Sequence, residues 1–201
     1  AFSLWARPRL PAGVPIHWGI SGQPDGRASP LGAALLLPLT GLGVMLLMAF
    51  LPRIDPRREN YRLHGPTYRL LVNEPGVFVG AIQVFVIASG LGWPVRMGTV
   101  VPVAVGLLFI VIGNVLSRLR PNWFAGIRTP WTLSSERVWR QTHRVGGYCF
   151  VAGGMLLAAA GLAAPDWMLA AVIVTGVVVA VVPIGYSYLP WRSDRGPEAG
   201  T

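Results

Sequence analysis

Long apolar stretches separated by polar segments dominate the pattern of this chain. Five of these stretches contain no Asp, Glu, Lys or His in their interior. A bilayer core of about 30 Å requires about 20 apolar residues in a helix, because backbone polar groups find no partner in lipid. The pattern therefore predicts an all-α, polytopic transmembrane helix bundle with five complete spans. We expect these spans at 31–51, 77–95, 98–117, 147–164 and 167–189.

The connections between the spans divide the chain further. The second and third spans, and the last two, are joined by a few residues, which predicts antiparallel hairpins. Two connections are long, 52–76 and 118–146. The apolar start, Ala1–Ala6, is too short to span, and we interpret it as the end of a first transmembrane helix, which makes six spans in the complete protein. The predicted organisation is residues 1–30 as helix end and external arm, 31–189 as bundle, and 190–201 as cytoplasmic tail.

Charge indicates how the bundle is oriented. The chain has 17 basic residues, all arginine, against eight acids, for a net charge of +9. Thirteen of the arginines lie in the two long connections and the tail, which the positive-inside rule places in the cytoplasm. We therefore expect a multi-pass protein of the plasma membrane with segment 7–30 outside. Direct binding of nucleic acid is not predicted, because the arginines punctuate long apolar runs.

The external arm shows two local patterns. Apolar and other residues alternate from Val14 to Ile20, which is typical of a short strand. The sequence 22–26 follows, with the Pro, Asp and Gly that favour a turn. His17 and Asp25 suit either a metal or proton-linked pair or purely local hydrogen bonds, and two ligands fall short of a usual zinc site. The candidate residues of the arm are His17, Trp18, Gly22, Pro24 and Asp25.

The second long connection is the most specific segment. Pro121 and Pro130 exclude a continuous helix, and Thr132 or Ser134 ahead of Glu136 is a helix start signal. We expect a short helix from about Ser135 to Val145 along the inner membrane surface, with its arginines on one face. One interpretation is an anchor for anionic membrane lipid, and the other is a surface for a protein partner.

The residues of this connection carry a resemblance. The sequence from Asn122 to Thr132, which includes Gly-Ile-Arg-Thr-Pro-Trp-Thr, and the later Trp139 with Thr142-His143-Arg144 resemble the signature of the SdpI family of integral membrane immunity proteins. The arm, with Pro15-Ile16-His17-Trp18, is similar to the small N-terminal domain that accompanies it. The signature residues are Asn114, Asn122, Gly126, Arg128, Thr129, Pro130, Trp131, Thr132, Trp139, Thr142, His143 and Arg144.

This resemblance implies a bacterial membrane protein with six helices. It implies resistance of a cell to its own secreted peptide toxin, the sporulation-delaying toxin, and a second role as a sensor that holds a cytoplasmic repressor at the membrane. No cofactor is predicted. The alternatives are a small-molecule transporter or permease component and a structural subunit of a larger complex. A cavity running from the arm into the bundle favours transport, and a solid bundle with an exposed inner basic face favours the sensor.

The remaining polar residues give little support for other chemistry. With no ionisable group inside the predicted spans, an ion-coupled pump is not expected. Nor does the sequence contain a phosphate-binding glycine loop, a catalytic triad or a CxxC pair, so an enzyme is not predicted. We expect Asn114 to hydrogen-bond the folded-back loop, and Glu74 to neutralise Arg128 or Arg144.

Overall fold

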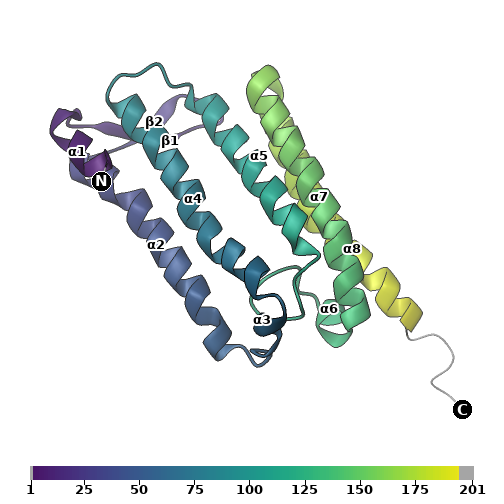
Figure 1. The fold of residues 1–201 in the computed structure, drawn as a ribbon. Coiled ribbons are helices and arrows are strands. Elements are labelled where there is room, and N and C mark those ends of the chain that lie inside the picture. Colours follow the sequence, from purple (N-terminus) through teal and green to yellow (C-terminus); the bar gives the residue numbers. More distant parts are fainter. Residues whose placement is uncertain (1, 195–201) are drawn as a thin grey trace, which may run out of the picture.

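The computed structural model describes residues 2–194, which form a helical bundle with a small β hairpin at one end (Figure 1). Among these residues five helices are long and apolar enough to cross a membrane. The prediction of an all-α polytopic bundle with five spans is thereby confirmed. The five are α2 (Pro30–Ile54), α4 (Gly65–Gly90), α5 (Met97–Leu116), α7 (Glu136–Ala163) and α8 (Met168–Asp194).

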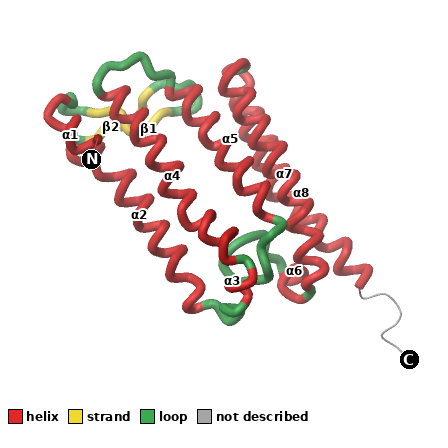
Figure 2. The backbone as a smooth tube through the Cα atoms, viewed as in Figure 1, coloured by secondary structure: helices red, strands yellow, loops and turns green. Residues whose placement is uncertain are grey.

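Shorter elements lie at the two ends of this bundle. The hairpin end has α1 (Phe2–Ala6), η1 (Arg7–Arg9), β1 (Val14–Trp18), β2 (Pro24–Ala28) and η2 (Pro165–Trp167). The opposite end, which we call the junction end, has α3 (Asn60–Leu63), α6 (Pro130–Ser134) and the two long connections, whose loops are green in Figure 2. The last part of the predicted tail, residues 195–201, lies outside the described residues.

Two helices differ from the predicted spans in ways that matter for function. Helix α4 begins at Gly65 and ends at Gly90, so that the last residues of the predicted span 77–95 are loop and much of the first long connection is helix. Helix α7 is continuous from Glu136, without the separate surface helix that we expected. Its signature residues Trp139, Thr142 and His143 are buried on the same face as its glycines, so tertiary packing extends the helix past the apolar run.

Small residues hold α5 and α7 together. A Cβ on Gly106 would lie 2.5 Å from the Gly154 carbonyl oxygen, and one on Gly113 would lie 2.7 Å from the Gly147 oxygen. Such contact between backbones is the way small residues stabilise helix pairs in membranes. Helix α8 packs on α7, while α2 packs on α4. The bundle therefore consists of two groups, α2 with α4 and α5 with α7 and α8, joined along α4 and α5 (Figure 1).

A hydrogen bond repairs the break that a proline makes in α2. Pro52 has no N–H, and so the carbonyl of Met48, one turn earlier, loses its helical donor. The hydroxyl of Tyr68 in α4 donates to this carbonyl at 2.6 Å. A second polar group joins α4 to the hairpin end, where the Gln83 amide donates to the Ser3 hydroxyl and to the Ala33 carbonyl. These bonds fix α4 against α1 and α2.

The β hairpin corrects the predicted turn. Strands β1 and β2 pair antiparallel, with Val14 opposite Ala28 and Trp18 opposite Pro24. The chain reverses at Gly19–Gln23, where the Gly22 amide donates to the Gly19 carbonyl and Gly22 has a φ of 75°. The predicted turn at 22–26 is therefore wrong, because Pro24 opens the second strand, a place that proline tolerates.

A polar junction and an apolar pocket as the candidate functional site

Asn122 is the centre of a polar cluster at the junction end, and its side chain is completely buried. Its amide nitrogen donates to the carbonyls of Arg120 and Ala125, each at 3.0 Å. Its carbonyl oxygen accepts from the backbone N–H groups of Phe124 and Ala125. One side chain thus replaces the backbone partners that a loop broken by prolines lacks. We call this cluster, with Asp55, Tyr61, Asn122, Trp139 and His143, the polar junction.

Asp55 brings the first long connection into the junction. This carboxylate is 3% exposed and accepts from the Tyr61 hydroxyl at 2.7 Å and from the Trp123 N–H at 2.9 Å. It also accepts from the N–H of Arg57 at 2.7 Å. Burial and the hydrogen bond to Asp55 raise the pKa of Tyr61, so that this hydroxyl stays a donor. Sequence reasoning missed Asp55, Asn60, Tyr61 and His64.

Further bonds join the same two connections. The Asn60 amide donates to the Pro121 carbonyl at 2.6 Å, and the Arg57 guanidinium donates to the Leu133 carbonyl at 2.7 Å. The Arg120 N–H is 3.4 Å from Nδ1 of His64. Burial lowers the pKa of His64, which is 3% exposed and stays a neutral acceptor. The first connection is therefore a structural partner of the signature loop.

His143 is held in one tautomer by its neighbours. The Ile127 N–H donates to Nε2 at 3.0 Å, and Nδ1 lies 2.8 Å from the Trp139 carbonyl oxygen. Because Nε2 accepts, Nδ1 must carry the hydrogen, and the ring is neutral. The ring is fully buried and stacks on Trp139, with centroids 4.0 Å apart. His143 thus acts as a bridge between α7 and the loop.

Gly126 is the residue that lets the loop reach His143. Its φ is 110°, a conformation that side chains of L-residues rarely adopt. A Cβ at this position would overlap the His143 ring. The Gly-Ile sequence of the signature is therefore explained by backbone geometry and by the ring that it contacts.

The threonines and Pro130 of the signature form a helix cap. Thr129 caps α6 by accepting from the Thr132 N–H, and the Thr132 hydroxyl accepts from the Thr129 N–H, an arrangement known as a capping box. Pro130 occupies the first turn of α6, where its missing N–H is not needed. The Thr129 hydroxyl also lies 3.2 Å from that of Ser187, which ties α6 to α8.

The remaining signature residues divide into buried and exposed ones. Trp139 is fully buried and donates from its indole N–H to the Leu119 carbonyl, while Trp131 packs against Tyr188 and Trp191 of α8. Thr142 is also fully buried. Arg128 and Arg144 are exposed, and they donate to the Trp123 carbonyl and the Tyr148 hydroxyl. We expected one of these arginines to pair with Glu74, and neither does. Asn114 donates within its own helix, to Ile110, so the expected bond to the loop is absent as well.

The candidate residues of the arm lie at the other end of the bundle. His17 Nδ1 is 2.5 Å from a carboxylate oxygen of Asp25 across the two strands, and both side chains are more than half exposed. Among the described residues no group of three or more His, Cys, Asp or Glu side chains is arranged to hold a metal. Trp18 lines the pocket described next, Gly22 forms the turn, and Pro24 begins β2.

A pocket of about 630 Å³ lies beneath the arm and extends into the bundle. Residues 16–20 cover it, and side chains of α2, α4, α5, α7 and α8 line it. The lining is almost wholly apolar, with His17 at the arm and Thr175 on α8 as exceptions. Its size and composition are those of sites that bind small apolar ligands. Buried polar groups are thus concentrated at the junction end, and this apolar pocket lies at the hairpin end.

Comparisons with known proteins match two parts of the chain and, in one relative, nearly all of it. A model of the SdpI/YfhL protein family matches residues 118–187, and one of a domain of unknown function, DUF1648, matches residues 1–42. The chain is 25% identical over 187 residues to the Immunity protein SdpI of Bacillus subtilis (strain 168), which covers 93% of this chain and 87% of that protein. No solved structure matches. These findings confirm that this multi-pass membrane protein resembles the SdpI family in the signature loop and in the helices that follow it.

Proposed function

We propose that this chain is an immunity protein of a bacterial plasma membrane, which protects the cell by holding an apolar segment of a secreted killing peptide in the pocket beneath the arm. The pocket of about 630 Å³ is the observation that carries the proposal. The relative that matches almost the whole chain is named as an immunity protein. An amphipathic peptide that reaches the membrane from outside presents the apolar surface that such a pocket binds.

The charge distribution supports the orientation that this function needs. With the two long connections and the tail in the cytoplasm, the hairpin end and its pocket face outward. A secreted peptide then meets the arm before it reaches the bundle. The junction, on this proposal, keeps the two helix groups together at the inner end so that the outer end can adapt to the peptide.

The test is protection from the peptide in living cells. The chain is expressed in a Bacillus subtilis strain that lacks its own immunity protein SdpI, and the cells are challenged with the sporulation-delaying peptide. We expect survival, and death of cells with a verified membrane population of the protein would refute the proposal for this peptide.

A matched pair of glycines tests the pocket itself. Gly176 lines the pocket, Gly185 lies on the same helix away from it, and a Cβ at either position meets nothing within 4 Å. Gly176→Phe should fill the pocket and lower protection at least tenfold, while Gly185→Phe should protect like the wild type. Equal protection by both variants would exclude the pocket as the peptide site.

We also propose a sensor role, in which exposed arginines at the inner end hold a cytoplasmic repressor. Arg137, Arg140 and Arg144 lie exposed along one side of α7, near Arg128 in sequence. Replacing Arg128 and Arg144 by Gln should release the repressor from membranes without loss of the protein. His143 is unsuitable for this test because it is buried. If recruitment is unchanged and binding of anionic vesicles is reduced, these arginines bind lipid instead.

A small-molecule transporter is the second candidate, because the pocket does run from the arm into the bundle. The exposed arginine face expected for the sensor is present as well, so the two features do not separate the candidates. Vesicles that contain the protein separate them. An immunity protein should bind the labelled peptide at the outer face, whereas a small-molecule transporter should leave the peptide unbound and accumulate a small apolar solute in the lumen.

A further inference from the structure

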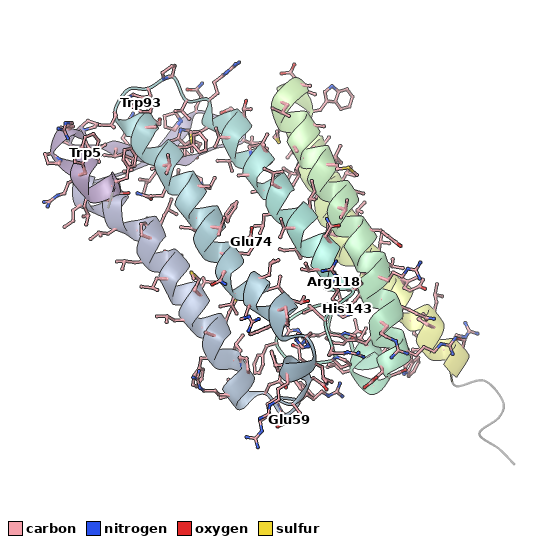
Figure 3. All side chains as sticks on the ribbon, in the orientation of Figure 1. Trp5, Glu59, Glu74, Trp93, Arg118 and His143 are labelled. Atoms are coloured by element: carbon pink, nitrogen blue, oxygen red, sulfur yellow. The ribbon has the colours of Figure 1, made fainter. Side chains whose placement is uncertain are left out.

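Glu74 lies inside a membrane-spanning helix. It belongs to the predicted connection 52–76, but α4 begins at Gly65, nine residues before it. At a rise of 1.5 Å per residue, Glu74 is about 13 Å along α4. Figure 3 shows it well away from both ends of the helix. The helix that contains the predicted span 77–95 therefore also includes an ionisable side chain, ahead of the apolar run.

The Glu74 carboxyl has no described partner. Its Oε2 is buried and forms no hydrogen bond, and none of the ion pairs among the described residues includes it. An isolated charge in low-dielectric surroundings is so costly that such a group is normally found neutral. An ionisable residue within a span is rare, and it marks a proton or ion site more often than a structural feature.

The elements packed on α4 supply few groups that could neutralise a carboxylate. Helices α1 and α5 contain no ionisable side chain, α2 contributes only Arg53 near its end, and β1 contributes only the distant His17. Arg53 donates to the carbonyl of Ala49 on its own helix. The other neighbours are Tyr61 and Arg62 of α3 and Tyr68 and Arg69 on α4 itself, all toward the junction end.

Pro75 adds an acceptor for a proton. Because proline has no N–H, the carbonyl of Leu71 loses the donor that an uninterrupted helix provides. A protonated carboxyl is a donor, whereas a carboxylate only accepts. The Leu71 carbonyl, one turn before Glu74, is therefore an acceptor that a protonated carboxyl could use and a carboxylate could not.

We propose that Glu74 is an intramembrane proton-binding site, occupied by a proton in the packed arrangement seen here. Loss of the proton places a charge in the span and favours separation of α4 from its neighbours. The site is independent of the peptide pocket, and it stands whether or not the chain acts in immunity.

The experiment uses dicyclohexylcarbodiimide, an apolar reagent that modifies protonated carboxyls, on the full chain in lipid vesicles. Trypsin separates the sites cleanly, because the fragment between Arg69 and Arg96 contains Glu74 as its only acid and the fragment between Arg58 and Arg62 contains only Glu59. Glu59 is highly exposed and serves as the internal control. At pH 7 we expect at least tenfold more labelling of Glu74 than of Glu59, falling as the pH is raised.

Two substitutions of Glu74 and a competition with sodium ions test whether the labelled site binds a proton. Glu74→Gln should remove the label from its fragment, and Glu74→Asp should retain it. The native structure binds this proton more tightly than the unfolded chain, and so wild-type stability in micelles should fall relative to Glu74→Gln as the pH rises above about 4. Equal labelling of the two glutamates, or a stability difference that does not change with pH, would overturn the proposal. Protection of Glu74 by sodium ions at constant pH would also overturn it, in favour of a cation site.

Discussion

The two ends of the bundle use buried surface in opposite ways. At the junction end, Asp55, Asn122 and His143 are almost completely buried, and each makes at least two hydrogen bonds. At the hairpin end, a pocket of about 630 Å³ is lined by apolar side chains beneath two short strands. The junction end is held by a network of hydrogen bonds, whereas the hairpin end contains a pocket whose apolar walls form few hydrogen bonds.

This difference indicates that the junction end has a fixed structure and that the hairpin end can adapt its shape to a ligand. A buried polar group that loses its partner costs about 1–3 kcal/mol, so the network has one good arrangement. Apolar walls accept ligands of several shapes, because dispersion contacts have little directionality. The family signature therefore describes mainly how the junction is built, and the adaptable surface lies in the part of the chain around the arm.

The largest effect is expected from Asp55→Ala, which breaks the junction. The Tyr61 hydroxyl and the N–H groups of Arg57 and Trp123 would lose their acceptor. We expect a loss of about 3 kcal/mol in the free energy of unfolding, measured by denaturation in detergent micelles. Asp166→Ala, at an exposed acid of the hairpin end, should change stability by less than about 0.5 kcal/mol. Equal effects would contradict the contrast between the two ends.

Gly126→Ala should have the next largest effect. The new methyl group would force an unfavourable φ and displace the His143 ring, at a cost of about 2–3 kcal/mol. The control is Gly43→Ala in α2, where a Cβ meets nothing within 4 Å and where alanine favours the helix by about 0.5–1 kcal/mol. The same unfolding measurement compares them, and a neutral Gly126→Ala would show that the loop does not depend on this geometry.

The pH dependence of stability should come partly from His64. Burial lowers its pKa, so the unfolded chain binds a proton that the native protein does not. Stability should therefore fall as the pH drops below about 6.5, the usual value for histidine. In His64→Asn the amide oxygen can still accept from the Arg120 N–H, and the decline should be shallower. Identical pH profiles for the two proteins would show that His64 does not contribute.

The smallest effect is expected at His17 and Asp25, the exposed pair of the arm. Exposed ion pairs contribute about 0–1 kcal/mol, so Asp25→Asn should lower stability by less than about 0.5 kcal/mol. Thermal unfolding should also be unaffected by zinc or by a chelator if the pair is only local. A zinc-dependent rise in the melting temperature that disappears in Asp25→Asn would instead identify a metal pair.

Particular residues show how far the sequence could be interpreted alone. The apolar runs were sufficient for five helices, because the requirement for internal backbone bonding leaves few other structures in lipid. Helix starts were less certain, since α4 begins ahead of its apolar run and α7 begins at Glu136. The extra turns of α7 are stabilised by bonds of Trp139 and His143 to the loop before it, and Leu71 of α4 packs against the cluster that contains Trp139. A local pattern does not contain such contacts.

The signature residues were found by resemblance, and their roles depended on the fold. Asp55 looked like one acid in an arginine-rich connection, and its place became clear only when Tyr61 and Trp123 were seen to bind it. The sequence did contain a signal, because residues 55–64 include an Asp, an Asn, a Tyr and a His, four side chains that form directional hydrogen bonds. Their partners in the second long connection lie more than 50 residues away, so spacing alone does not reveal them.

The sequence by itself determined the class of this protein, the five apolar helices among its described residues and the family that its second long connection resembles, because hydrophobic length and a local motif are properties of contiguous residues. Only the tertiary structure decided that the signature is mostly buried, that the arm covers a pocket, and that Glu74 lies within a helix without a partner. These facts depend on which side chains meet across the bundle, and burial is a property of that assembly of helices.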